Sequence, residues 1–125
     1  IVQELKLDGA LIVTTPGEVA LADVRRGIKM FRAEGIDVPV WGIVENMAWF
    51  TPEELPNNRY YIFGKSGAKR YAEEVGVDLL GEVPIIQSIM DGGDTGRPGS
   101  EFDERVSEYY AEIADKVVEK LPSEC

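Results

Sequence analysis

The chain has 125 residues, of which 44% are hydrophobic and 29% are charged, as expected for one globular domain. Its 13 basic and 23 acidic side chains give a formal net charge of −10, which argues against sequence-independent binding to nucleic acid or to an anionic membrane. No apolar stretch reaches the roughly 18 residues of a membrane span, and the first residues do not resemble a signal peptide.

Histidine is absent, and the single cysteine, Cys125, is the last residue. No intrachain disulfide can form, so we expect a cytoplasmic protein. Without histidine the chain lacks the commonest general base, and we predict neither a catalytic residue nor a metal site. Variants of nucleophilic catalysis that use serine and lysine stay open.

The first half of the chain reads as the end of a helix at residues 1–7, then strand, helix and strand. A short buried strand is predicted at 10–14, and an amphipathic helix at 19–33, where apolar residues recur every three or four positions. Gly35 is a natural left-handed cap for that helix. The apolar run at 38–44 is typical of a strand buried on both faces of a parallel sheet.

The second half begins with an irregular segment, 47–63, that is rich in turn-forming residues and aromatics. So dense an aromatic set in a loop implies that the loop packs on something. The later elements are a helix at 66–75, a strand at 79–83 ended by Pro84, a short helix at 85–90, a glycine-rich loop at 91–99 and a helix at 100–121 capped by Ser100.

This alternation of strands and helices predicts right-handed crossovers, and therefore an α/β fold with a parallel sheet and flanking helices. About three strands are visible, whereas such sheets usually have about five or six. The sequence therefore predicts part of a larger domain.

Asn46 follows the second predicted strand, and ligands of open α/β sheets bind just beyond the carboxyl ends of the strands. Its amide carries one acceptor and two donors, which suits it to reading the edge of a base. Alternatively, Asn46 orders the next loop through its own backbone. Glu45 and Pro84 share this edge with Thr14 and Thr15, for which capping of the following helix is the simpler interpretation.

Gly64-Lys65-Ser66 invites comparison with a phosphate-binding loop. The motif G-x-x-x-x-G-K-[ST] requires a glycine at position 59, which is Arg59, and a strand before the loop. Bulky aromatics at 60–63 stand where free backbone N–H groups would be needed. We therefore interpret these residues as a glycine turn with a helix cap at Ser66.

Four motifs in a fixed order carry a resemblance to a known family: V-T-T-P, G-I-V-E-N-M, an F-G turn and L-G-E-V-P. With them, nearly the whole of residues 1–98 resembles the C-terminal half of Mrp/ApbC-type ATPases. These are iron–sulfur cluster carriers of the MinD/ParA-like P-loop superfamily. The resemblance implies an ATP- and magnesium-dependent homodimer, and it implies that residues 1–125 are the C-terminal part of a single P-loop NTPase-like domain.

The resemblance assigns an adenine contact to Asn46 and places the backbone of Val83, Pro84 and Ile85 near the base. The family's phosphate-binding lysine loop, magnesium ligand and second acidic motif lie upstream of Ile1. This chain alone is therefore expected not to hydrolyse ATP. Many members carry a C-x-x-C pair after E-N-M, where two subunits share a cluster. The corresponding loop here has no cysteine, so it lacks the thiolate ligands that a cluster requires.

The predicted function is the C-terminal portion of an ATP-binding Mrp-like protein in iron–sulfur cluster assembly or transfer, contributing the adenine-binding side and a dimer surface. Iron–sulfur apo-proteins are the expected partners, with no nucleic acid and no membrane. Two alternatives stay open. One is a non-catalytic interaction module that uses the aromatic loop at 49–63. The other is a MinD-like positioning ATPase, which usually needs a basic amphipathic tail where this chain has an acidic last helix.

Overall fold

The computed structural model describes residues 7–52, 54–101 and 103–121. In this part of the chain, three strands form one parallel sheet in the order β1-β2-β3, which confirms the predicted α/β class. Six of the seven residues of the helix end predicted at 1–7 lie outside the described residues. The elements are β1 (Ala10–Thr14), α1 (Glu18–Arg32), β2 (Val40–Phe50), α2 (Gly67–Val75), β3 (Leu79–Ile85), α3 (Gln87–Thr95), the 3-10 helix η1 (Gly99–Glu101) and α4 (Glu104–Lys120).

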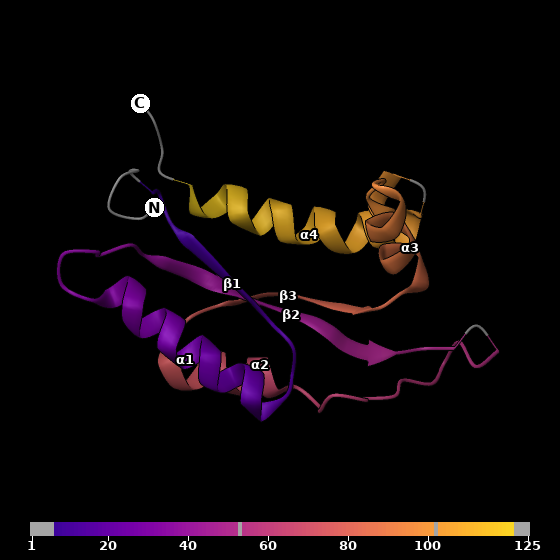
Figure 1. Ribbon diagram of the computed structural model, residues 1–125, viewed down its shortest axis with the longest axis horizontal. Helices are drawn as coiled ribbons and strands as arrows, with labels where there is room; N and C mark the ends of the chain where they lie inside the picture. The colour runs from indigo at the N-terminus through magenta and orange to yellow at the C-terminus, as the bar shows by residue number, and fades with distance from the viewer. Residues whose placement is uncertain (1–6, 53, 102, 122–125) are drawn as a thin grey trace.

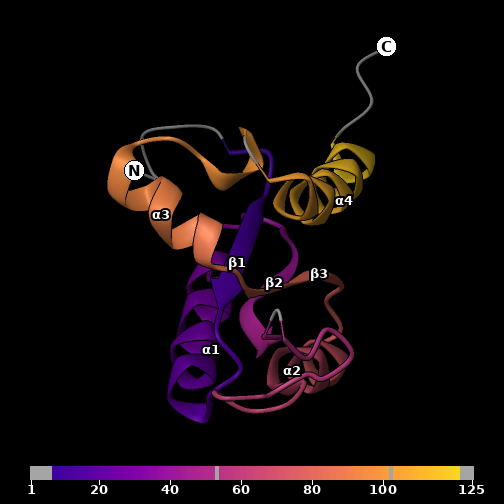
Figure 2. The ribbon, with the colours of Figure 1, turned by 90° about the vertical axis from the view of Figure 1, so that its right-hand side faces the viewer.

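Helices cover both faces of the sheet (Figure 1). Helices α1 and α2 lie on one face, and the view in Figure 2 shows α3 and α4 on the opposite side. Because successive side chains of a strand point to opposite faces, Ile43 of β2 packs beneath α1 and α2, whereas Val44 packs beneath α4. The sheet is thus packed between two apolar layers.

The larger core lies under α1 and α2 and consists of Leu21, Val24, Ile28, Ile43, Ala68, Tyr71 and Ala72. The residues contributed by α1 recur at spacings of three and four, which puts them on one face of the helix. The smaller core lies under α4 and consists of Val44, Leu80, Val83 and Ile113. Gly81 permits this second packing, because a Cβ atom there would lie 2.6 Å from Cγ1 of Ile113.

Strand β2 is longer than predicted, ending at Phe50 rather than at Val44. Phe50 pairs with Ile85 of β3 and, across an antiparallel bridge, exchanges two 2.8 Å backbone hydrogen bonds with Tyr60. These pairings arise from residues distant in sequence, which an apolar run does not reveal.

The extension of β2 is nevertheless irregular. The register with β3 shifts between Ile43 and Val44, is regular from Val44 to Asn46, and shifts again before Phe50. Met47, which follows Asn46, has a φ of +56°, a left-handed conformation that is uncommon for residues with a side chain. The backbone therefore bends directly after Asn46.

Strand β3 continues through Pro84 to Ile85 rather than ending at Val83. Proline has no N–H to donate and is found in sheets mainly on edge strands. Within the described residues β3 has a single neighbour, β2, so Pro84 is tolerated there.

The elements after β3 also differ from the prediction. Helix α3 occupies residues 87–95 and so takes up half of the predicted glycine-rich loop. Helix α4 begins at Glu104, with Asp103 rather than Ser100 as its N-cap. The Asp103 carboxylate accepts the Arg105 backbone N–H at 3.0 Å, and Ser100 lies within the preceding 3-10 turn. Two good capping residues three positions apart compete, and the one with a completed bond begins the helix.

Candidate functional site

Two hollows flank the carboxyl ends of the strands in the described part of the chain. The first, which we name the β1 crevice, has a volume of about 380 Å³. The second, which we name the α4 groove, has a volume of about 1000 Å³. The β1 crevice is lined by Ile12, Val13, Thr14, Thr15, Ala20, Asp23, Val24, Gly27 and Asn46. The α4 groove is bounded by three segments, residues 49–59 (Glu53 not described), residues 84–91 and the first half of α4.

Asn46 is half-buried and lines the β1 crevice. Its Oδ1 accepts the backbone N–H of Met47 at 3.0 Å, which confirms the predicted alternative that Asn46 orders its own backbone. This bond fixes the orientation of the amide next to the bend in β2. It uses one of the two lone pairs of Oδ1 and does not involve the Nδ2 hydrogens, so the side chain can still donate to a ligand.

The other predicted site residues lie in different places. Val83 is the register partner of Asn46, but its side chain is 1% exposed in the core beneath α4. Pro84 and Ile85 line the α4 groove. The sheet thus brings the four residues together along two neighbouring strands, while their side chains are divided between the crevice, the core and the groove.

Thr14 and Thr15 line the β1 crevice, yet neither caps α1. The N-cap of α1 is Gly17, which makes no side-chain cap bond, so the capping interpretation is wrong. The Oγ1 of the buried Thr14 instead donates to the carbonyl of Thr15 at 3.0 Å. Asp23, also in the crevice, accepts a hydrogen bond from Arg26 within α1.

The Gly64-Lys65-Ser66 segment forms a turn before α2, as interpreted from the sequence. Ser66 is the N-cap residue, but its hydroxyl makes no cap bond and its φ is +56°. The Lys65 ammonium lies 5.1 Å from the centroid of the Tyr61 ring. A Cβ atom on Gly67 would lie 2.4 Å from the Pro16 carbonyl oxygen. Glycine therefore serves close packing of this turn against the loop after β1.

Glu45 is the most unusual residue at this edge, because its side chain is 0% exposed. Neither carboxylate oxygen has a hydrogen-bond partner within the described residues. Burial, and then the charge of Glu82 on β3, raise the pKa of Glu45 to about 7, while the Ala68 N–H and Arg70 oppose this shift more weakly. The sequence placed Glu45 at the carboxyl edge of the sheet but did not predict that Glu82 lies next to it. The parallel register of β2 with β3 makes these two residues neighbours.

The aromatic segment packs in part, as predicted. Trp49 is 7% exposed, and its ring meets Tyr109 of α4 edge-on, with centroids 6.2 Å apart. The Arg59 guanidinium lies 4.0 Å from the centroid of the Trp49 ring. Phe50 and Tyr60 each keep more than a third of their surface exposed. The segment therefore has one buried anchor and several accessible apolar side chains.

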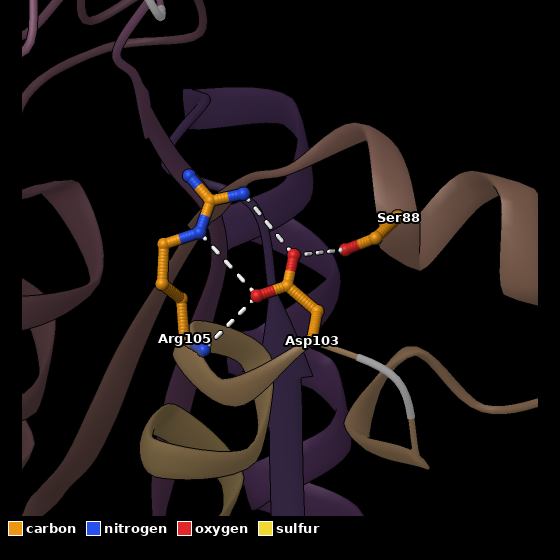
Figure 3. A network of polar contacts seen from close by, with 3 residues as sticks. All are labelled: Ser88, Asp103 and Arg105. Carbon is orange, nitrogen blue, oxygen red and sulfur yellow. Dashed lines mark hydrogen bonds and ion pairs between the residues drawn. The ribbon is translucent and has the colours of Figure 1, made fainter.

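A polar network joins α3 to the start of α4 at one end of the α4 groove (Figure 3). Asp103 accepts hydrogen bonds from Ser88 Oγ at 2.8 Å and from the Arg105 side chain at 3.3 and 3.1 Å. The bonds from Arg105 and then Ser88 lower the pKa of Asp103 to about 2. The carboxylate is thus fixed in its ionised form.

No three histidine, cysteine, aspartate or glutamate side chains among the described residues are grouped to hold a metal ion. The loop after Asn46 does not fit an iron–sulfur cluster, because clusters need thiolate ligands and Cys125 is far along the chain. No helix in the described ranges has the length and apolar content needed to cross a membrane.

A parallel sheet with helices on both faces, and polar groups at the carboxyl ends of its strands, defines an open α/β fold of the class that binds ligands at that edge of the sheet. The cell division ATPase MinD of Pyrococcus furiosus shares this fold with a TM-score of 0.65 at 21% identity, over 90% of this chain and 43% of that one. A nucleotide-binding protein from Archaeoglobus fulgidus, described in complex with ADP, is 36% identical with a TM-score of 0.62, over 74% of this chain and 37% of that one.

The family described as ParA, NUBPL iron-transfer P-loop NTPase, matches residues 1–118, and the chain belongs to this family. It is 46% identical over 121 residues to an Arabidopsis thaliana iron–sulfur protein required for NADH dehydrogenase, covering 95% of this chain and 38% of the relative. It is 47% identical over 96 residues to the iron–sulfur cluster carrier protein of Synechocystis, covering 77% of this chain and 27% of the relative. The chain thus spans less than half the length of these relatives, and the predicted family resemblance is confirmed.

Proposed function

We propose that this chain forms the base-binding side of an ATP-binding P-loop NTPase, and that the longer protein assembles or transfers iron–sulfur clusters. The observation that carries the proposal is the register pair of Asn46 with Val83. It sets a half-buried amide beside the Pro84–Ile85 segment at the carboxyl end of the sheet, where such folds bind ligands. The relative described in complex with ADP supports a nucleotide as that ligand.

Each residue has a role that its surroundings allow. The bond from the Met47 N–H holds the Asn46 amide in place, so that Nδ2 can donate to a ring nitrogen of adenine. Pro84 and Ile85 offer apolar surface against which a base can pack. Val83 contributes its backbone, because its side chain is committed to the core. ATP, when bound with magnesium, would supply a transferable phosphoryl group, and the residues of this chain bind and orient the base.

The exposed edge of β1 supports the proposal that residues 1–125 are the C-terminal part of a single domain. Val13 is 64% exposed and Leu11 is 39% exposed, on a strand whose single neighbour among the described residues is β2. Apolar edge strands without charged protection usually pair or are covered. A further parallel strand of the longer protein would cover this edge.

The remaining parts of the proposal concern the longer protein. We propose that it forms a homodimer, acts in the cytoplasm and passes clusters to iron–sulfur apo-proteins. The family and the cluster carriers among its relatives support an iron–sulfur cluster as the group that is transferred. Because the loop after Asn46 contains no cysteine, the thiolate ligands of a cluster would have to come from outside this loop.

Titration of the ¹⁵N-labelled chain with ADP tests the base site. We expect the Asn46 side-chain amide and the backbone amides of Val83 and Ile85 to shift in the NMR spectrum, because they border the proposed base. The response should be lost in Asn46→Ala and kept in Asn57→Ala, a matched change at an exposed loop position. Absence of shifts at these amides, or equal responses in the two variants, would overturn the base-binding assignment.

A further inference from the structure

We infer that the α4 groove is a docking site for a basic, extended segment of a partner protein. Its lining combines aromatic and proline residues with an excess of carboxylates. The ligand is a protein segment rather than a nucleotide, so the inference extends beyond the proposed function, and the groove shares only Pro84 and Ile85 with the proposed base site. Three features of the groove support it, namely its apolar surface, its charge and its dimensions.

The apolar surface of the groove suits side chains with aliphatic stems and cationic ends. Trp49 and Tyr109 form a packed aromatic pair, and Phe50, which is 37% exposed, also lines the groove. The Arg59 guanidinium already lies over the Trp49 ring at 4.0 Å. Aromatic rings attract such cations through their electron-rich faces, so arginine or lysine side chains of a ligand would meet a compatible surface.

The charge of the groove is strongly unbalanced. Both lining cations are engaged: Arg59 lies over Trp49, and Arg105 pairs with the Asp103 carboxylate at 3.1 Å. The other four lining carboxylates have no cationic partner within the described residues. This excess attracts basic side chains. The four are Glu54, Asp91, Glu108 and Glu112.

The dimensions of the groove fit an extended peptide. Its volume of about 1000 Å³ is at the upper end of the roughly 300–1,000 Å³ found for ligand pockets. Glu108 and Glu112 are one helical turn apart on the wall formed by α4, a separation of roughly 6 Å. Alternate side chains of an extended peptide are roughly 6.6 Å apart, so two basic residues separated by one other can each meet one of these carboxylates.

Fluorescence anisotropy with a labelled nine-residue peptide of alternating arginine and proline tests the inference on the full chain. The peptide should bind at low salt, and a peptide with glutamate in place of arginine should not. Glu108→Gln combined with Glu112→Gln should raise the Kd about tenfold, since two exposed pairs of up to about 1 kcal/mol are lost. Phe50→Ala should raise it several-fold without changing the charge.

The matched control is Asp115→Asn combined with Glu119→Gln. These residues are also one turn apart on α4 and exposed, but they do not line the groove. The control keeps the same net charge as the groove variant and should bind the peptide within about twofold of the unchanged chain. Circular dichroism of each variant confirms that the comparison is between folded proteins.

Three outcomes would overturn the inference. Failure of the arginine–proline peptide to bind shows that the groove does not take basic segments. Equal weakening by the groove and control variants shows non-specific attraction to an acidic protein. Self-association of the chain that the groove variant abolishes, without peptide binding, assigns the groove to a second copy instead.

Discussion

The N-termini of α2 and α4 each lie beside a carboxylate, and the pKa values of these two groups are shifted in opposite directions. Asp103 is the N-cap of α4 and accepts hydrogen bonds from Ser88 and Arg105, which lower its pKa to about 2. Glu45 reaches the start of α2 from β2, is wholly buried and faces Glu82, and its pKa is raised to about 7.

Proximity to a helix N-terminus therefore does not by itself stabilise an anion in this protein. A helix dipole favours a nearby carboxylate by about 0.3–1 kcal/mol, whereas removal of a carboxylate from water without hydrogen bonds costs several kcal/mol. At Asp103 completed bonds replace the lost water. At Glu45 no such bonds replace the lost water, and the Ala68 N–H only partly compensates for burial and for the charge of Glu82. The start of α2 is thus sensitive to pH near neutrality, and the start of α4 is not.

The largest expected effect is that of Glu45→Gln on the pH dependence of stability. The folded-state pKa of Glu45 is raised, so its stabilising contribution is complete below about pH 4.5 and is lost as the pH rises through about 7. The shift corresponds to a loss of on the order of 3 kcal/mol in the free energy of unfolding. The variant, measured by urea denaturation between pH 5 and 8, should largely remove this loss.

Glu74→Gln, at an exposed position of α2, provides the control and should leave the pH profile of the unchanged chain intact. A Glu45→Gln profile that falls as steeply as that of the unchanged chain would show that another group titrates in this range. Glu45 would then not be the source of pH sensitivity at the start of α2, and the contrast with Asp103 at the start of α4 would be lost.

A smaller effect is expected for Asp103→Ala, which removes the cap of α4. Loss of an N-cap side chain costs about 0.5–2 kcal/mol, and the loss of Ser88's partner places the effect in the upper half of that range. The folded-state pKa of Asp103 is lowered, so its contribution is present above about pH 3.8 and is lost as the pH falls through about 2.

Denaturation of Asp103→Ala at pH 7 and at pH 2 measures this dependence directly. The destabilisation should be clear at pH 7 and should shrink at pH 2, where the Asp103 carboxylate of the unchanged chain is about half protonated. Asp115→Ala, at an exposed position within α4, should cost less than 0.5 kcal/mol at either pH. A pH-independent cost at position 103 would mean that packing, rather than charge, is lost.

The sequence was sufficient for the features that depend on local periodicity. The apolar spacing in α1 identified the face that carries Leu21, Val24 and Ile28, and the apolar run in β2 identified a strand buried on both sides. The position of Asn46 at the end of regular pairing followed from the polar break after that run. The two predicted roles of Asn46, recognition of a base and ordering of its own backbone, came from its side-chain chemistry. The structure shows the second of these roles.

The features that depend on register could not be predicted in the same way. Glu45 and Glu82 are 37 positions apart, and only parallel pairing of β2 with β3 makes them neighbours. The commitment of the Val83 side chain to the core follows from which face of β3 meets α4. Asp103 rather than Ser100 is the cap because its carboxylate accepts the Arg105 backbone N–H, which residue preference alone does not determine.

The smallest effect is expected at Ser66, where the cap of α2 differs from that of α4. The Ser66 hydroxyl makes no cap bond, so Ser66→Ala should change the free energy of unfolding by less than 0.5 kcal/mol, as at an ordinary surface position. Its φ of +56° favours glycine, so Ser66→Gly should stabilise the chain by about 0.5–1 kcal/mol. Urea denaturation at pH 7 measures both variants. A loss above 1 kcal/mol in Ser66→Ala would show that the hydroxyl caps α2 after all, and the two helix starts would then differ in their carboxylates alone.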